Sequence, residues 1–159
     1  MKKTQNAVAA LLGEYEKAIL ELQNVIADIP KKDLSLVVDN LTANPDCRSI
    51  QTILAHAVSS GYSYCIYIQK LKKNDVKHPG KVLRFSIAEY KKDLEDVLQF
   101  TYDTFSDIVD DELEEPDNTK KIKTSWGQQY DIEQIMEHAI VHILRHRRQI
   151  EIFKSKLVQ

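Results

Sequence analysis

The chain has 159 residues and a formal net charge of −2, with only four glycines and four prolines. This length favours a single domain over residues 1–159 with a sizeable hydrophobic core. The near balance of charge gives no reason to expect a nucleic-acid partner, since nucleic-acid binding usually needs a basic stripe. No window approaches the roughly 20 apolar residues that span a bilayer, so we expect no membrane partner.

The first residues do not resemble a signal peptide. Lys2 and Lys3 are followed by polar residues such as Gln5 and Glu14, which interrupt any apolar stretch. The chain has two cysteines, which cannot form a framework of disulfides. We therefore expect a cytoplasmic protein whose cysteines are reduced.

Apolar residues recur at three- and four-residue spacing in four segments, and this periodicity predicts four helices. The first is predicted over residues 4–29, ending before Pro30, which biases its neighbour away from helical torsions. A polar connection with at most a short helical turn follows. The second helix is predicted over residues 49–71, with Ser49 as its N-cap, and residues 72–81 are predicted to form a solvated turn.

The third predicted helix has the clearest start. Ser86 and Glu89 match an S-x-x-E capping box, and Phe85 and Tyr90 stand where a hydrophobic staple would close. The apolar stripe of this helix breaks up in the acidic run over residues 110–117. The run lacks the spaced ligands of an EF-hand loop, so we interpret it as a solvated loop rather than a cation site.

A small hairpin or extended turn is predicted around Gly127, just before the last helix. Asp131 and Gln134 have the spacing of a capping box, and the fourth helix is predicted to continue to about Lys156. Four helices with these connections predict an all-α bundle, a fold in which sites are commonly built from side chains on facing helices.

Three of the five histidines, His138, His142 and His146, recur at intervals of four in this last helix. Residues four apart share a helix face, with Cβ atoms roughly 5–6 Å apart, so two imidazoles at this spacing can hold one metal ion. His138 and His146 are separated by roughly 12 Å along the axis, which is too far for both to bind the same ion easily.

The helical wheel distinguishes these histidines from one another. His146 lies roughly 30° from the centre of the apolar stripe and His142 roughly 70° from it. His138 lies further round the helix, toward Arg145 and solvent. We therefore expect His142 and His146 to face inward and His138 to lie at the rim of any cavity that they line.

A pair of histidines is not a stable zinc site, because zinc prefers four ligands and catalytic sites commonly have three protein ligands. His56 is the remaining histidine inside a predicted helix, whereas His78 lies in a lysine-rich turn and is expected to be exposed. Without a metal, His56 would be a partly buried polar residue and the pair a solvated face. No HExxH motif is present, which argues against a metalloprotease.

The segment 142–150 resembles the H-x-x-x-H-R-G-Q signature of the DinB/YfiT-like superfamily. Residues 49–56 are similar to the second-helix pattern of that superfamily, in which an apolar helix carries one histidine. Trp126-Gly127 followed by Tyr130 resembles the approach to its last helix. Each motif is short, but together they occur along the chain in the right order and spacing.

This resemblance implies an up-down four-helix bundle of the DinB/YfiT type, often a homodimer. It also implies a divalent metal ion, zinc or nickel, with His56, His142 and His146 as the ligands. Members of the superfamily are associated with metal-dependent transfer of low-molecular-weight thiols such as bacillithiol, mycothiol or glutathione. Our preferred hypothesis is such a transferase acting on a small-molecule substrate. A hydrolase that uses metal-activated water and a non-catalytic metal-binding or interaction bundle are the alternatives.

Two features depart from the superfamily pattern and bear on the substrate pocket. Arg148 replaces the usual glycine, and tyrosines such as Tyr64 and Tyr67 occupy the region where a tryptophan often follows the second-helix histidine. We expect Tyr67 in the core or at a dimer interface rather than in the pocket. Arg147 and Gln149 are candidates for supporting the site or for a purely structural role.

Overall fold

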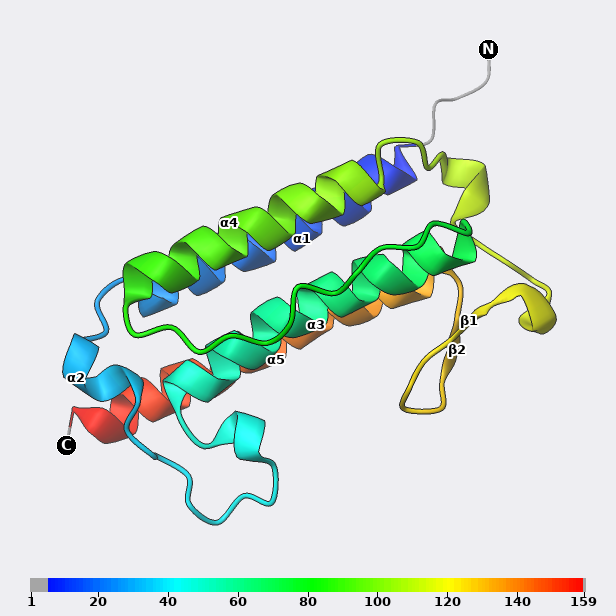
Figure 1. The fold of residues 1–159 in the computed structure, drawn as a ribbon. Helices are drawn as coiled ribbons and strands as arrows, with labels where there is room; N and C mark the ends of the chain where they lie inside the picture. Colours follow the sequence, from blue (N-terminus) through cyan, green and yellow to red (C-terminus); the bar gives the residue numbers. More distant parts are fainter. Residues whose placement is uncertain (1–5, 159) are drawn as a thin grey trace.

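The computed structural model describes residues 6–158, and the prediction of an all-α protein is confirmed (Figure 1). Within those residues the long helices are α1 (Ala7–Ile26), α3 (Ile50–Leu71), α4 (Ile87–Thr104) and α5 (Ile132–Leu157). The shorter elements are α2 (Lys31–Leu34), the 3-10 turns η1 (Pro45–Cys47), η2 (Asp110–Glu112) and η3 (Asn118–Lys120), and the strands β1 (Ile122–Lys123) and β2 (Gln129–Tyr130). No helix in residues 6–158 is both long enough and apolar enough to cross a membrane.

Side-chain caps set the starts of three long helices where the sequence predicts them. Ser49, Ser86 and Asp131 each accept a hydrogen bond from the backbone N–H three residues on, at 3.1, 3.2 and 2.8 Å respectively. Such a bond satisfies one of the backbone donors that a helix start leaves unpaired. The staple predicted at the start of α4 is wrong, because Tyr90 is fully buried while Phe85 is 66% exposed.

The helix α1 takes its cap from a distant part of the chain. The carboxylate of Asp110, in the acidic run, accepts hydrogen bonds from the backbone N–H groups of Ala7 and Val8 at 3.1 and 2.9 Å. A negative charge here also meets the positive end of the helix dipole. The predicted start at Thr4 lies outside the described residues, and the helix ends at Ile26, slightly earlier than predicted.

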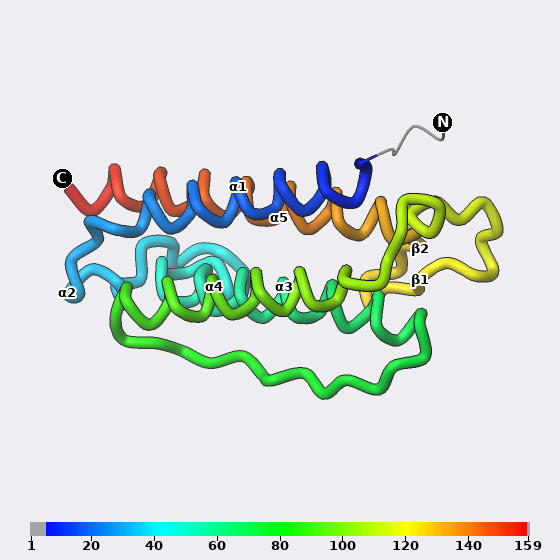
Figure 2. The backbone as a smooth tube through the Cα atoms, turned by 90° about the horizontal axis from the view of Figure 1, so that it is seen from above, coloured from blue at the N-terminus to red at the C-terminus, as the bar shows by residue number. Residues whose placement is uncertain are grey.

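Neighbouring helices do not simply alternate in direction. Figures 1 and 2 show α1 and α5 running one way and α3 and α4 the other. At the starts of α3 and α4, the Gln51 side chain donates to the carbonyl of Arg84 at 2.7 Å; at their ends, Gln69 donates to Thr104 Oγ1 at 3.3 Å. The bundle is therefore up-down-down-up, which differs from the simple alternation that an up-down bundle implies.

The segment 72–86, here called the crossover segment, makes this topology possible. It leaves the end of α3 and runs back along the bundle to the start of α4 (Figure 2). Fully extended, this segment reaches roughly 50 Å, which exceeds the length of about 27 Å that α4 covers. The turn predicted over residues 72–81 is thus part of a long connection. Turn-forming residues such as Pro79 and Gly80 indicate that a segment is not helical, but they do not show in which direction the chain runs.

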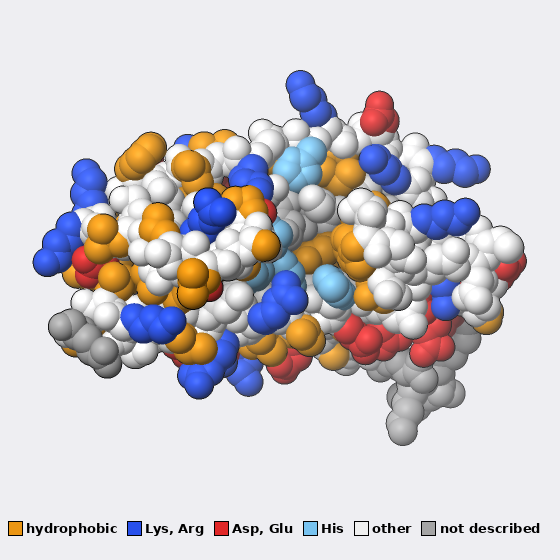
Figure 3. All heavy atoms as spheres, turned by 90° about the horizontal axis from the view of Figure 1, so that it is seen from below, with side chains coloured by type: hydrophobic (Ala, Val, Ile, Leu, Met, Phe, Trp, Pro, Cys, Tyr) orange, Lys and Arg blue, Asp and Glu red, His pale blue; other side chains and the backbone are white. Residues whose placement is uncertain are grey.

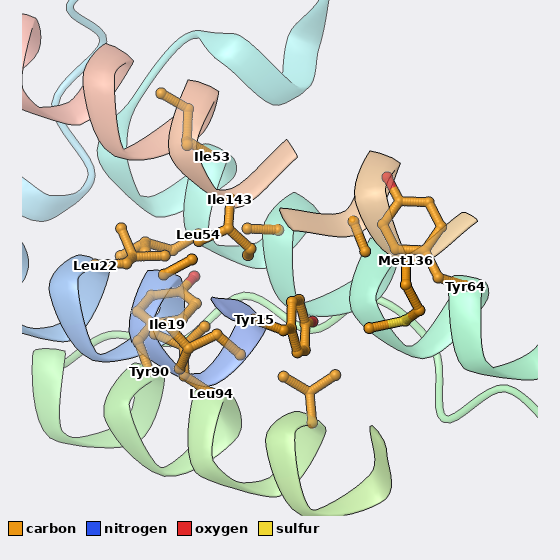
Figure 4. Close-up of a cluster of buried hydrophobic side chains, with 14 of the residues drawn as sticks. Tyr15, Ile19, Leu22, Ile53, Leu54, Tyr64, Tyr90, Leu94, Met136 and Ile143 are labelled. Carbon is orange, nitrogen blue, oxygen red and sulfur yellow. The ribbon is translucent and has the colours of Figure 1, made fainter. Parts of the chain in front are cut away.

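One hydrophobic core fills the space between the four long helices (Figure 4). Each large apolar side chain that is fully buried contributes on the order of 1.5–3 kcal/mol to folding through the hydrophobic effect. The side chains of this core that are essentially inaccessible to solvent include Tyr15, Ile19 and Leu22 of α1, Ile53 and Leu54 of α3, Tyr90 and Leu94 of α4, and Ile135 and Ile150 of α5.

At Gly61, on α3, the neighbouring helices leave no room for a side chain. A Cβ atom there would lie 2.7 Å from Cγ2 of Val97 and 2.9 Å from the hydroxyl of Tyr15, and both neighbours are buried. We predict that Gly61→Ala lowers the free energy of unfolding by roughly 1–3 kcal/mol, because overpacking forces the surrounding side chains to move. Urea denaturation followed by circular dichroism measures the change.

Gly13→Ala is the matched control, because Gly13 is exposed on α1 and a Cβ atom there would have no neighbour within 4 Å. It should raise stability by roughly 0.5–1 kcal/mol, since alanine loses less backbone entropy than glycine in a helix. Equal effects of the two substitutions would contradict the close approach at Gly61.

Candidate metal centre

Three histidines from two antiparallel helices converge in the middle of the bundle. α3 supplies His56, and α5 supplies His142 and His146 one turn apart. Nε2 of His142 lies 3.0 Å from Nε2 of His56 and 3.0 Å from Nε2 of His146. The candidate ligand atoms of all three lie within 4.8 Å of one another. The structure thus brings together the three histidines that the superfamily resemblance implies as ligands.

These imidazoles are largely shielded from solvent. His142 is 6% and His146 1% exposed, as expected for residues that face inward, and the His56 side chain is about a quarter exposed, at 24%. Burial is the main cause that lowers the pKa of His142 to about 2 and that of His146 to about 4, and it also lowers the pKa of His56. All three rings are therefore neutral near pH 7.

The outer nitrogens of two of these rings have acceptor partners. Nδ1 of His146 donates to the Oε1 atom of Gln149 at 2.6 Å, and Nδ1 of His56 lies 3.3 Å from Oδ2 of Asp46. An acceptor at Nδ1 holds the proton there, so Nε2 keeps its lone pair for a metal. Nδ1 of His142 is buried and has no hydrogen-bond partner among the described residues.

This tautomer pattern fits a divalent cation. The Nε2 atoms of His56 and His146 both direct a lone pair at Nε2 of His142. Nε2 of His142 carries at most one proton and can donate it to one of them. Without a cation, the other contact would therefore bring two lone pairs together. Nitrogen ligands at about 2.0–2.1 Å from one ion, at angles of about 90–110°, lie roughly 2.8–3.4 Å apart. The observed separations of 3.0 Å agree with that spacing. Three protein ligands also leave a coordination position for another ligand.

The position of Asp46 depends on two irregular segments. Asp46 lies in η1, where its backbone N–H donates to Oδ1 of Asn44 at 3.0 Å. Its second carboxylate oxygen pairs with Nζ of Lys81, in the crossover segment, at 2.6 Å. Partly exposed ion pairs of this kind add little to stability. This one orients the carboxylate that contacts His56, so the crossover segment contributes to the geometry of the centre.

A cavity of about 430 Å³ opens onto His56 and His142. Figure 3 shows histidine side chains at the bottom of a hollow near the middle of this face, with hydrophobic and basic side chains around it. The volume lies in the range of roughly 300–1,000 Å³ that is typical of small-molecule sites. The other lining residues are the aromatic Tyr64, Tyr67, Trp126 and His138, the polar Asn44, Ser60, Ser63 and Ser125, and the basic Arg145.

The aromatic wall ties the β1–β2 hairpin to the helices. His138, at the rim as predicted, stacks on Trp126 with ring centroids 5.1 Å apart and an interplanar angle of 22°. Its ring centroid lies 6.2 Å from that of His142. Tyr67 packs against the core, in part as expected, but it also lines the cavity, from which it was excluded in the sequence analysis. Its hydroxyl accepts a hydrogen bond from the N–H of Ser125 at 2.9 Å.

Other residues singled out from the sequence have structural roles. His78 was expected to be exposed but is half-buried, because its Nε2 donates to the carbonyl of Ser59 at 3.0 Å and its Nδ1 accepts from the N–H of Gly80 at 2.9 Å. Arg147 pairs with Glu21 of α1 and so links two helices. Of Arg147 and Gln149, the two residues considered for supporting the site, it is Gln149 that contacts a candidate metal ligand, His146.

Arg148, the residue that replaces the superfamily glycine, is exposed and lies 3.7 Å from Glu151 of the same helix. It is not among the residues that line the cavity.

Two residues of the site were missed in the sequence analysis: Asp46, and Arg145 as part of the cavity lining. Asp46 lies in an irregular segment without periodicity. Arg145 is exposed, as the wheel indicates, but it also borders the cavity, and the wheel of one helix does not show which segments pack beside it.

No protein-family model matches the chain, and no curated protein matches it in sequence. The likeness to the DinB/YfiT-like superfamily therefore depends on the motif residues themselves, above all the three histidines.

We predict that the metal-free protein loses stability as the pH falls below about 6.5, the ordinary pKa of histidine. The unfolded chain gains protons in this range, whereas His142 and His146, with pKa values of about 2 and about 4, stay neutral in the folded protein. Folding therefore becomes less favourable until the pH reaches the folded pKa. For His146 alone, linkage gives a loss of about 2 kcal/mol between pH 7 and pH 5.

Urea unfolding of chelator-treated protein at the two pH values measures this loss. The His146→Leu variant should lose about 2 kcal/mol less than the wild type over the same interval. An equal loss in both proteins would show that His146 takes up its proton as readily in the folded state as in the unfolded one.

Proposed function

We propose that the protein is a metal-dependent enzyme of the DinB/YfiT type that transfers a low-molecular-weight thiol to an electrophilic small molecule. His56, His142 and His146 hold the divalent ion. The observation that carries the proposal is the convergence of three Nε2 atoms beside a cavity of small-molecule size. The ordered motifs, which place these histidines on the second and last long helices, support the assignment to this bundle type. The homodimer that the resemblance implies remains a prediction.

The donor set supports a catalytic rather than a purely structural ion. Structural zinc sites are usually closed by four protein ligands, whereas three ligands beside a cavity leave room for a reactant. When bound, a divalent ion lowers the pKa of a coordinated thiol or water. Imidazole ligands suit both zinc and nickel, so both metals fit the proposal. Asp46 and Gln149 hold the rings of His56 and His146 in the orientation that such an ion needs.

The lining of the cavity favours a thiol over water as the nucleophile. No Asp or Glu is among the described residues that line the cavity, so the usual carboxylate base for activating water is missing there. A thiol has an ordinary pKa near 8.5 and ionises near pH 7 once that value is lowered by a few units. In the transfer, the thiol proton passes to solvent, a sulfur–carbon bond forms, and the leaving group departs with its bonding electron pair.

We predict that tag-free protein contains a divalent ion and that His56→Ala, His142→Ala and His146→Ala each remove most of it. Loss of a residue that hydrogen-bonds to a metal ligand typically weakens metal binding roughly 10–100-fold. Loss of one of the three ligands themselves should weaken it by more than that. His138→Ala is the matched control and should retain the metal. Elemental analysis of the purified proteins measures the content. Unchanged metal in the three ligand variants would refute the site.

We also predict that the metal-loaded protein accelerates the reaction of bacillithiol, mycothiol or glutathione with monochlorobimane, which releases chloride and becomes fluorescent. The rate should fall to that of the uncatalysed reaction after chelation and in His142→Ala. Inactivity with all three thiols, together with metal-dependent cleavage of an ester or amide, would instead identify a hydrolase that uses activated water.

A further inference from the structure

We propose that the cavity binds a small carboxylic acid with a flat apolar body, and that Arg145 is the residue that binds the carboxylate. The anion site itself is independent of the metal. The further statement that the opposite end of the molecule faces His56 and His142 rests on the proposed function. Charge, helix geometry and the shape of the lining each support this substrate class.

The first argument is the charge of the lining. Arg145 is the only Lys, Arg, Asp or Glu among the described residues that line the cavity. Arg84, Arg147 and Arg148 lie in ion pairs with carboxylates. Arg48 and Arg145 form no ion pair with any described residue, and of these two Arg145 lines the cavity. A cavity with one cation and no carboxylate favours anions and offers an amine no counter-ion.

The second argument is the place of Arg145 on α5. Side chains three and four residues away are the ones that a helical arginine can reach on its own helix. At those positions α5 carries Val141, His142, Arg148 and Gln149, and none of them is a carboxylate. The helix therefore gives Arg145 no partner and places it beside the face that carries His142. A planar guanidinium in this position can bind a carboxylate through two parallel hydrogen bonds.

The third argument is the shape of the remaining wall. Trp126 and His138 stack nearly parallel, and Tyr64 meets both rings nearly edge-on, with centroid distances of 6.3 and 5.4 Å. Aromatic faces of this kind bind flat apolar groups, and the hydroxyls of Ser60 and Ser63 lie in the same lining for additional hydrogen bonds. The cavity thus combines an anion anchor with a flat apolar surface and, at its floor, the metal-binding histidines.

Binding can be measured directly, because Trp126 is the only tryptophan of the chain and lines the cavity. We would titrate chelator-treated and zinc-loaded full-length protein with benzoate, and with benzamide as its neutral counterpart, and follow tryptophan emission. We expect benzoate to bind both forms at least about tenfold more tightly than benzamide, since hydrogen bonds to charged groups are stronger than neutral ones. Arg145→Gln should raise the Kd for benzoate about tenfold or more and leave that for benzamide unchanged.

Arg148→Gln is the matched control, because Arg148 is an exposed arginine on the same helix that does not line the cavity, and it should bind both compounds as the wild type does. Equal benzoate affinity in Arg145→Gln and wild type would overturn the proposal, as would equal affinity for benzoate and benzamide, or no binding of benzoate. If benzoate binding required zinc and were unchanged in Arg145→Gln, the carboxylate would bind the metal. This result would refute the role of Arg145 and leave the proposed function standing. Arg145-dependent binding to a protein that takes up no metal would uphold the anchor and refute the proposed function.

Discussion

The mutual orientation of three neutral imidazoles between α3 and α5 is the arrangement on which the rest of the site depends. Buried polar groups are costly unless they are paired, and here the Nε2 atoms of His56 and His146 face a third nitrogen at 3.0 Å, which at most one proton can bridge. The hydrophobic core offsets this cost. A ligand that binds only the folded state adds its binding free energy to folding, so an ion at this place would stabilise the whole bundle.

The helices supply the inner part of the site, and the irregular segments supply much of the outer part. α3 and α5 are antiparallel neighbours, which brings His56 opposite the pair on α5. The crossover segment holds Asp46 through Lys81, and the hairpin adds Trp126 to the cavity wall. The same bundle core can thus carry different pockets, because changes in the connections alter the wall without moving the three histidines.

Much of the helical framework could be predicted from the sequence, because periodicity and capping residues act within single segments. The 3.6-residue repeat determines the faces of one helix, so the inward positions of His142 and His146 followed from spacing alone. Periodicity could not show that His56 meets them, and that expectation came from the superfamily resemblance. The parallel run of α3 and α4 and the contact of Asp46 with His56 were missed, because both depend on contacts between segments far apart in the chain.

The parallel packing of α1 along α5 has a consequence for the order of folding. Nζ of Lys154 donates to the carbonyl of Val25 at 2.7 Å across a separation of 129 residues, and the cap of α1 comes from Asp110. During synthesis the apolar face of α1 leaves the ribosome long before its partner helix exists. Distant contacts of this kind form later than local ones, because closing a long loop costs entropy, and the exposed apolar face of α1 is open to association meanwhile. The packing of α1 is therefore completed only after α5 has been made, and the three histidines cannot meet until α5 has been translated.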